Sequence, residues 1–191
     1  MCGRYYIALD YEELREILYE ARQNAKKSEH MAKTGEIFPA DIAPVLTAGA
    51  RPQAMRWGFA RNDGKGCIIN ARSETAAQKA MFQRALREGR CLIPASNYFE
   101  WEALPDGKKR KYAIFSGEPV LYMAGLYRQE PGAELPAFVV LTKEAERGIS
   151  FLHDRMPVIL TRAEQLSWLN GELDVKKCGG TVELRAERVE K

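Results

Sequence analysis

The sequence predicts a single α+β domain in which short strands outnumber helices. Apolar residues form many runs of about four to eight residues, each bounded by turn-forming residues, which is the pattern of strands. Few segments carry apolar residues at helical spacing. The 191 residues, of which 46% are hydrophobic, suffice for one sizeable core, and no linker or repeat divides residues 1–191. Long-range pairing of so many strands predicts a curled sheet or a partly open β-barrel with a few flanking helices.

The first two helical segments lie in the first half of the chain. One helix is expected over roughly 11–25, where Asp10 followed by Glu13 resembles a capping box. A second is expected over 74–88, with Gly89 as its stop. The apolar stripes that define these helices consist of Leu14, Ile17, Leu18, Ala21, Ala77, Met81, Ala85 and Leu86.

Short apolar runs elsewhere predict strands. The expected ranges are 42–47, 53–59, 67–72, 91–102, 111–115, 120–127, 137–142, 157–160 and 181–184. A Pro-Asp-Gly turn at 105–107 joins two of these runs and predicts a hairpin. Residues 23–35 are polar and are expected to form a loop, whereas 162–169 is expected to form a third, short helix.

Composition and charge make several classes of function improbable. The formal net charge is only +3, so binding to a polyanion has to rest on the local placement of arginines. The four cysteines are widely spaced, without a C-x-x-C pair, and the chain has only two histidines. Neither a zinc site nor a disulfide framework is therefore expected. No cofactor is expected. No stretch approaches the roughly 18–20 apolar residues of a membrane span. We expect a monomeric cytoplasmic protein with no membrane partner.

The most informative residue stands second in the chain, which begins Met1-Cys2-Gly3-Arg4-Tyr5. A small second residue favours removal of Met1, which leaves Cys2 with a free amine beside its thiol. The reference pKa values are roughly 7.7–8.0 for the amine and 8.5 for the thiol, so both groups react near neutrality. The amine forms a Schiff base with an aldehyde. The thiol then closes that imine into a five-membered thiazolidine. The alternative is an early cysteine that is simply buried.

Four segments embed polar residues in strand-like apolar surroundings. They are Cys2-Gly3-Arg4, Ile69-Asn70-Ala71-Arg72-Ser73-Glu74-Thr75, Cys91-Leu92-Ile93-Pro94-Ala95 running to Phe99-Glu100-Trp101, and His153-Asp154-Arg155-Met156-Pro157-Val158. Taken singly, Asn70 reads as a turn residue, Glu100 as an outward-facing strand residue and His153 as a helix-end or hydrogen-bonded core histidine.

Together, and in this order, the four segments resemble the SOS response-associated peptidase (SRAP) family, whose members capture abasic DNA. The resemblance covers nearly the whole chain and includes Trp57-Gly58-Phe59 and Ala124-Gly125-Leu126-Tyr127. The initial MCGR and the combination of NAR, P-A-x-x-x-F-E-W and H-D-R-M-P are its most specific motifs. The resemblance implies the SRAP fold over residues 1–191 and abasic sites in DNA as the target.

The resemblance also implies the chemical role of four residues. Processed Cys2 is the nucleophile through both its nitrogen and its sulfur. Glu100 accepts and donates protons beside the Cys2 amine, and His153 is the acid that assists opening of the sugar ring. Asn70 orients the Cys2 amine or the sugar through its amide. The expected product is a thiazolidine DNA–protein crosslink that protects DNA during the damage response, with cleavage of the DNA by β-elimination (AP lyase activity) as an associated reaction.

The expected DNA contacts are Arg4, Arg72 and Arg155, because an arginine beside a chemical residue can fork onto phosphates. Trp57 is expected to stack on an exposed base, with core packing as the alternative. For Arg155 the alternative is a structural ion pair. Thr142 resembles a family position near phosphate. Single-stranded DNA at the nucleoid is the expected substrate, because a duplex would hide the abasic sugar.

Two positions depart from the family pattern. After Trp57-Gly58-Phe59 many members continue with Pro and an aromatic residue, whereas this chain reads Ala60-Arg61-Asn62-Asp63. The change affects how this loop contacts DNA. Asn97 stands where other members often have Gly or another small residue before the aromatic pair.

Two other functions are left open by the sequence. One is a thiol peptidase in which Cys2, Asn70, Glu100 and His153 act on Met1 or on other peptides. Removal of Met1, by the chain itself or by an aminopeptidase, would then be one such cut. Aldehyde capture explains an N-terminal thiol better. The other function is non-enzymatic, a reader of modified bases or a plain binding module, and it predicts reversible binding that survives Cys2→Ala.

Overall fold

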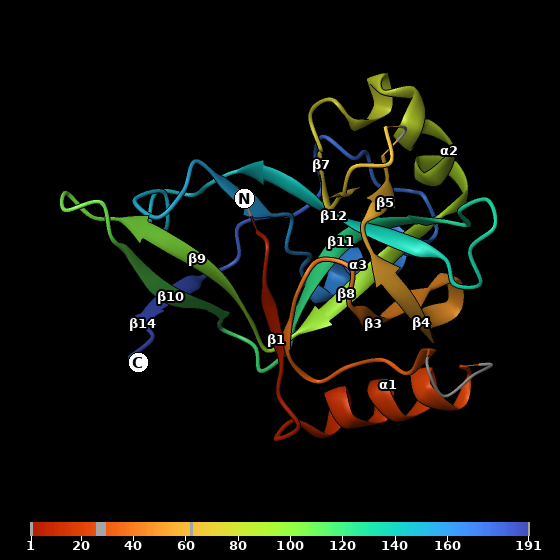
Figure 1. Cartoon of the computed structure of the whole chain (residues 1–191), viewed down its shortest axis with the longest axis horizontal. Coiled ribbons are helices and arrows are strands. Elements are labelled where there is room, and N and C mark those ends of the chain that lie inside the picture. The colour runs from red at the N-terminus through yellow and green to blue at the C-terminus, as the bar shows by residue number, and fades with distance from the viewer. Residues whose placement is uncertain (1, 26–29, 62, 191) are drawn as a thin grey trace.

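The computed structural model describes residues 2–25, 30–61 and 63–190. Figure 1 shows two β-sheets side by side, and strand β1 (Tyr5–Ile7), which belongs to the smaller sheet, lies near the middle of the view. Three α-helices flank the sheets within the described part of the chain: α1 (Glu12–Gln23), α2 (Ala80–Glu88) and α3 (Arg162–Leu169). None of these helices is long and apolar enough to span a bilayer.

The larger sheet closes on itself into a ring. Its strands are β3 (Ile42–Thr47), β4 (Arg51–Trp57), β7 (Asn70–Arg72), β8 (Arg90–Ala95), β11 (Leu121–Arg128), β12 (Ala137–Glu144) and β13 (Arg155–Pro157). They follow one another in the order β11-β8-β3-β4-β12, and β12 pairs again with β11. Strands β7 and β13 extend the ring along β12. The strand-rich α+β class and the curled sheet are thus confirmed.

The second sheet is antiparallel throughout and has the order β14-β10-β9-β1-β2. Its remaining strands are β2 (Gly35–Ile37), β9 (Asn97–Ala103), β10 (Lys109–Ser116) and β14 (Leu184–Arg188). The expected strand 91–102 is two strands, because the chain passes from β8 in one sheet to β9 in the other at Ser96. The Ser96 hydroxyl fixes this passage by donating to the Tyr6 carbonyl (2.8 Å) and accepting from the Ala8 N–H (3.1 Å).

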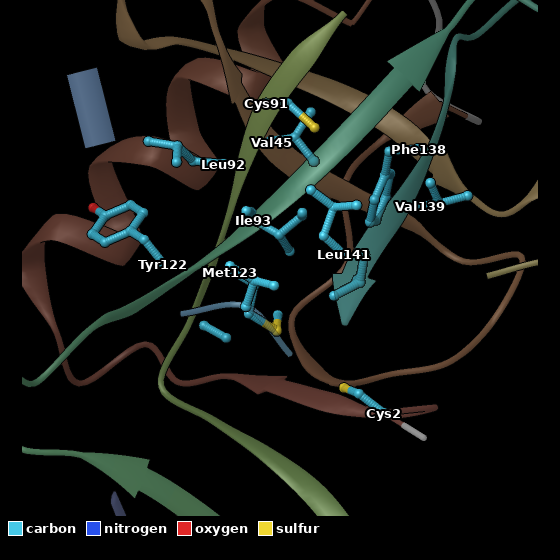
Figure 2. Close-up of a cluster of buried hydrophobic side chains, with 14 of the residues drawn as sticks. Cys2, Val45, Cys91, Leu92, Ile93, Tyr122, Met123, Phe138, Val139 and Leu141 are labelled. Carbon is cyan, nitrogen blue, oxygen red and sulfur yellow. The ribbon is translucent and has the colours of Figure 1, made fainter. Parts of the chain in front are cut away.

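A single buried cluster joins the two sheets. The Trp57 ring, from β4, stacks on Phe138 with 6.2 Å between ring centroids and 7° between ring planes. On its other side the ring centroid lies 5.1 Å from that of Tyr5 in β1. The Trp57 indole N–H also donates to the Ile69 carbonyl at 3.1 Å. Figure 2 shows side chains of the ring strands gathered in this cluster, with Cys2 at its margin.

Two of the expected helices differ in their first turn. Helix α1 begins at Glu12 without a side-chain cap, so the expected capping box is wrong. Its Glu13 carboxylate instead accepts a hydrogen bond from the Tyr122 hydroxyl (2.5 Å), a tertiary contact that the local pattern does not reveal. The helix expected over 74–88 begins only at Ala80, after a 3₁₀ turn at Ala76–Gln78. The helix at 162–169 is confirmed.

The hairpin at the Pro-Asp-Gly turn is confirmed and pairs β9 with β10. Gly107 has a φ of +77°, which glycine adopts without strain. Three short strands differ from expectation. The last strand is displaced toward the C-terminus, to Leu184–Arg188 rather than 181–184, and β1 and β2 were not predicted. The strands expected over 53–59 and 67–72 are both interrupted, so that β5 (Phe59–Ala60) and β6 (Cys67–Ile68) form a separate pair.

Candidate functional site

Cys2 lies just before β1 and is fully buried. Its carbonyl accepts a hydrogen bond of 2.9 Å from the amide Nδ2 of Asn70. Its thiol donates to the carbonyl of Arg4, with 3.7 Å between Sγ and O. Asn70 begins β7, which is held in parallel pairing by β12, so a short strand of the ring fixes the residue that holds Cys2. The two residues are 68 positions apart in the chain, and only the fold joins them.

Glu100 lies on the neighbouring strand, β9, and is 6% exposed. The Phe99 N–H donates to the Arg4 carbonyl (2.9 Å), which aligns the first residues of the chain with this part of β9. Burial raises the pKa of the Glu100 carboxyl, and the positive charge of His153 opposes part of this rise. A buried glutamic acid of this kind exchanges its proton at a higher pH than an exposed one does. It is therefore suited to general acid–base chemistry.

The same burial acts on the nucleophile. Burial, followed by the negative charge of Glu100, raises the pKa of the Cys2 thiol. The thiol is therefore neutral near pH 7, and sulfur becomes a strong nucleophile only as its proton leaves. This arrangement favours a reaction in which another group attacks first and the thiol follows.

His153 stands in the segment between β12 and β13. Its Nδ1 accepts a hydrogen bond from the Arg155 backbone N–H (3.0 Å), which in the neutral ring leaves the proton on Nε2. The Asp154 carboxylate lies 2.5 Å from the same Nδ1. The neutral imidazole can thus present a proton at Nε2.

The three arginines singled out from the sequence have different surroundings. The Arg4 side chain is partly exposed, pairs with Glu36 (3.2 Å), and its guanidinium lies over the rings of Phe38 (4.5 Å) and Trp101 (5.0 Å). Arg72 is exposed at the end of β7. These two arginines are accessible to a phosphate chain.

Arg155 is held within the protein. Its guanidinium forks onto the Glu74 carboxylate, with N–O distances of 2.7 and 2.9 Å, and donates to the Thr142 carbonyl at 2.7 Å. The hydrogen bonds from Arg155 lower the pKa of the Glu74 carboxyl. This arrangement matches the structural ion pair that the sequence left open for Arg155. It ties β13 to the turn after β7.

Two residues expected to touch DNA are covered by protein. Trp57 is fully buried between Tyr5 and Phe138, so it offers no ring face to a base, and the core-packing reading holds for it. Thr142 is also fully buried, with its hydroxyl oxygen 3.4 Å from an Arg155 nitrogen. Both side chains support the site from behind rather than line its surface.

The structure also places residues beside the site that the sequence reading did not select. Alternation along β9 puts Tyr98 and Glu100 on one face of the sheet and Phe99 and Trp101 on the other. We call the second face the outer sheet face; it carries Arg4, Tyr6, Phe38, Phe99, Trp101 and Lys111. Tyr6 and Phe38 are 38% and 40% exposed. The signal in the sequence that could have identified this face was the alternation of side chains with a period of two around Glu100.

A groove of about 610 Å³ continues from the outer sheet face along the β9–β10 hairpin. Its lining comprises Trp101, Leu104, Lys108, Lys109, Arg110, Lys111, Arg188, Val189 and Glu190. Lys111 pairs with Glu36 (2.8 Å) and lies over the Phe99 ring (3.7 Å). Burial alone would raise the pKa of the Glu36 carboxyl, but hydrogen bonds from Lys111 and Arg4 lower this pKa. The lining residues Lys109 and Arg188 form no ion pair within the described residues.

The sequence matches a protein-family model described as SOS response associated peptidase (SRAP) over residues 1–188. It is 30% identical to the abasic site processing protein YoaM of Bacillus subtilis, covering 89% of this chain and 79% of that protein. It is also 30% identical to the abasic site processing protein YedK of Escherichia coli, covering 93% and 83%. The abasic site processing protein HMCES of Xenopus tropicalis is 28% identical, with coverage of 92% and 68%.

Solved structures have the same fold. A protein from Bacteroides thetaiotaomicron superposes with a TM-score of 0.82 at 22% identity, covering 99% of this chain and 92% of that one. A protein from Bordetella bronchiseptica superposes with a TM-score of 0.80 at 23% identity, covering 100% of each chain.

Proposed function

Because the chain belongs to the SRAP family, we propose that it processes abasic sites in DNA by capturing them covalently on Cys2. Relatives with 30% identity are named abasic site processing proteins, which supplies the target. The buried residues Cys2 and Glu100, with the half-buried Asn70, supply chemistry suited to an aldehyde. An open abasic sugar carries such an aldehyde at C1′.

The proposed reaction has two bond-forming steps. With Met1 removed, the neutral amine of Cys2 attacks C1′ and the carbinolamine loses water, which gives an imine. The sulfur then attacks the imine carbon, and the thiol proton is transferred to the nitrogen. The product is a thiazolidine, and one water leaves overall. Residue 1 lies outside the described residues, so its removal is part of the proposal.

The proton transfers fall to Glu100 and His153. Glu100, whose pKa is raised by burial, donates the proton that carries away the carbinolamine oxygen as water and takes it up again in the reverse step. His153 offers its Nε2 proton to the ring oxygen of the sugar as the ring opens. Asn70 holds the Cys2 carbonyl at 2.9 Å and thereby fixes the direction in which the amine and the thiol of Cys2 point. If β-elimination follows imine formation, the same groups move its protons, which gives AP lyase activity.

Single-stranded DNA is proposed to lie on the outer sheet face. Trp101 and Phe38 offer aromatic surface for bases, and the Arg4 guanidinium, which lies over both rings and pairs with Glu36, is close enough to meet a phosphate. Arg72 is placed for phosphates at the other end of the site. An unpaired strand can bend onto such a surface and present its sugar to Cys2, whereas a stacked duplex cannot.

The observation that carries this proposal is the Asn70 hydrogen bond to Cys2 beside the buried Glu100. The test is incubation of Met1-free protein, verified by intact mass, with an abasic single-stranded oligonucleotide, followed by a denaturing gel. A shifted band is expected for the wild type and none for Cys2→Ala. A Cys2→Ala variant that gives the same shifted band refutes capture on Cys2.

The structure argues against a general thiol peptidase. In a cysteine protease the thiol is hydrogen-bonded to the catalytic histidine. Here the Cys2 thiol donates to the Arg4 carbonyl, and the His153 Nδ1 is occupied by the Arg155 N–H. Within the described residues no hydrogen bond joins Cys2 to His153. Casein incubated beside the abasic oligonucleotide is expected to remain intact.

A further inference from the structure

We propose that the hydroxyls of Tyr5 and Tyr98 donate hydrogen bonds to the Cys2 sulfur while it makes and breaks its bond to the captured sugar carbon. The inference rests on the proposed capture of an aldehyde by Cys2. It gives a role to two residues that the proposed reaction has not used.

Tyr5 and Tyr98 are directly opposite each other in the antiparallel pairing of β1 with β9. Their side chains therefore share one face of the sheet, and Glu100, two residues after Tyr98, shares it too. Tyr5 packs against Trp57 from the ring. Both tyrosines are fully buried, so their position is fixed by packing. The two phenols thus lie on the buried face of the sheet, in the cluster that also contains Cys2.

Neither hydroxyl has a hydrogen-bond partner among the described residues. The situation differs for two other tyrosines of the chain. The Tyr112 hydroxyl donates to Glu102 at 3.1 Å, and the Tyr122 hydroxyl donates to Glu13 at 2.5 Å. A buried hydroxyl without a partner is unfavourable, and such groups are retained where they serve a ligand or a reaction. Two unpartnered hydroxyls on directly paired residues point to a shared acceptor.

Cys2 belongs to the same buried cluster as both tyrosines, and before reaction no hydrogen bond joins either hydroxyl to its sulfur. Burial, and next a negative charge on Cys2, raises the pKa of the Tyr5 and Tyr98 hydroxyls. Both therefore remain protonated donors throughout the neutral range. The other titratable groups that interact with these hydroxyls are Asp41, Cys91, Glu100 and Glu146.

The sulfur is the atom that needs such donors. Closing the thiazolidine forms the S–C1′ bond while the thiol proton passes to the imine nitrogen. Reopening returns the electron pair to sulfur before a proton reaches it. Burial makes a negative sulfur unfavourable, which the raised pKa of the thiol reflects. Preorganised hydroxyl donors lower the energy of charge that develops in a buried site. The Cys2 S–H points to the Arg4 carbonyl, which leaves the sulfur free to accept.

The first test compares Tyr5→Phe, Tyr98→Phe and the double variant with the wild type, all with Met1 removed. Each is mixed with an abasic single-stranded oligonucleotide and sampled with and without borohydride, which traps the imine but leaves the thiazolidine unchanged. In the double variant, ring closure is expected to be about tenfold slower, because sulfur accepts hydrogen bonds more weakly than the oxygen of an oxyanion site. The borohydride-trapped fraction rises accordingly, and the rate of imine formation does not change.

The matched control is Tyr122→Phe, which removes a buried hydroxyl that has a partner. Its ring closure is expected to equal that of the wild type, whereas its stability to denaturant falls. Tyr5→Phe and Tyr98→Phe remove unpartnered hydroxyls, so their stability should equal or exceed that of the wild type. Closure at the wild-type rate in a folded double variant overturns the proposal. If the wild type itself gives no Cys2 adduct, the failure lies instead with the proposed function.

A second test requires no DNA. Alkylation of Cys2 by iodoacetamide, read from the mass of the N-terminal peptide, follows the ease with which the sulfur becomes negative. At a fixed pH near 8 the double variant is expected to react about tenfold more slowly than the wild type. Equal alkylation rates in the two proteins would contradict the proposed hydrogen bonds to the Cys2 sulfur.

Discussion

Glu100 and Trp101 are neighbours in β9, yet their side chains lie on opposite faces of the sheet in opposite kinds of surroundings. On the inner face, Glu100 is buried beside Cys2, and two tyrosine hydroxyls close by have no partner among the described residues. On the outer sheet face, the partly exposed Trp101 ring lies near the cations of Arg4 (5.0 Å) and Lys111 (5.8 Å), which share the Glu36 carboxylate.

The difference separates reaction from binding. Polar groups without partners in a buried place are costly to the folded protein and are retained for the reaction. Charges that are already paired at a surface cost little and can exchange partners with a phosphate chain. One strand with a period of two thus serves both purposes. Changes on the inner face should alter the rate at saturating DNA, and changes on the outer face should alter affinity.

The largest effect is expected on the inner face. Glu100→Gln keeps the shape of the side chain and removes its proton transfer, so crosslink formation should slow by at least about tenfold. Time courses at saturating abasic oligonucleotide measure this rate, and a filter-binding assay should show unchanged affinity. If the Glu100→Gln protein crosslinks at the wild-type rate, Glu100 does not transfer protons in the reaction.

The same substitution should make the fold more stable above mildly acidic pH. The folded pKa of Glu100 is raised, so the unfolded chain loses this proton at a lower pH than the folded chain does. Stability contributed by the protonated carboxyl is full below the unfolded pKa of about 4.3 and is lost as the pH rises through the folded pKa. Glu100→Gln has no such loss. Urea midpoints from pH 4 to pH 8 should diverge in favour of the variant as pH rises; a constant difference would contradict this.

A smaller effect is expected on the outer sheet face. Trp101→Ala should weaken binding of single-stranded DNA by about 1–3 kcal/mol, the contribution of one stacked base. Its crosslinking rate at saturating DNA should stay near that of the wild type. Tyr19→Ala, which removes an aromatic side chain that is exposed on α1, is the matched control and should leave affinity unchanged. If Trp101→Ala lowers the saturated rate and not the affinity, the division between the faces is wrong.

The smallest effect concerns the groove along the hairpin. Lys109→Gln should reduce the slope of log affinity against log salt by about one, because one phosphate contact is lost. Fluorescence anisotropy measures the affinity, and salt concentrations from 50 to 200 mM span a sufficient range for the slope. Lys176→Gln, at an exposed position outside the groove, should leave the slope unchanged. An unchanged slope for Lys109→Gln would confine DNA to the part of the outer sheet face near Arg4.

Sequence reasoning succeeded where local pattern decides the structure. The helix at 162–169 and the hairpin at 105–107 depend on neighbouring residues and were predicted correctly. Strands β1 and β2 have only three residues each and exist because β9 pairs with β1, so no local signal marks them. The same holds for Trp57, whose burial follows from its contacts with Tyr5 and Phe138, far away in sequence.

The site residues show the same division. The motifs around Cys2, Asn70 and Glu100 were identified from the sequence, and the fold brings Asn70 to Cys2 across 68 positions. A structural ion pair of Arg155 was one of two interpretations, but its partner Glu74 was not identified, because a pair separated by 81 positions has no local pattern. Trp101 belongs to the motif around Glu100 but was not predicted to contact DNA, because its role depends on which face of β9 the rest of the chain covers.

The most direct test of the account is peptide mapping of the protein after reaction with an abasic oligonucleotide. We expect an adduct on the peptide that begins with Cys2, with the summed mass of the two partners less one water, unchanged by borohydride. An adduct on a lysine instead, or a Cys2 peptide that remains unmodified while DNA is captured, would contradict it.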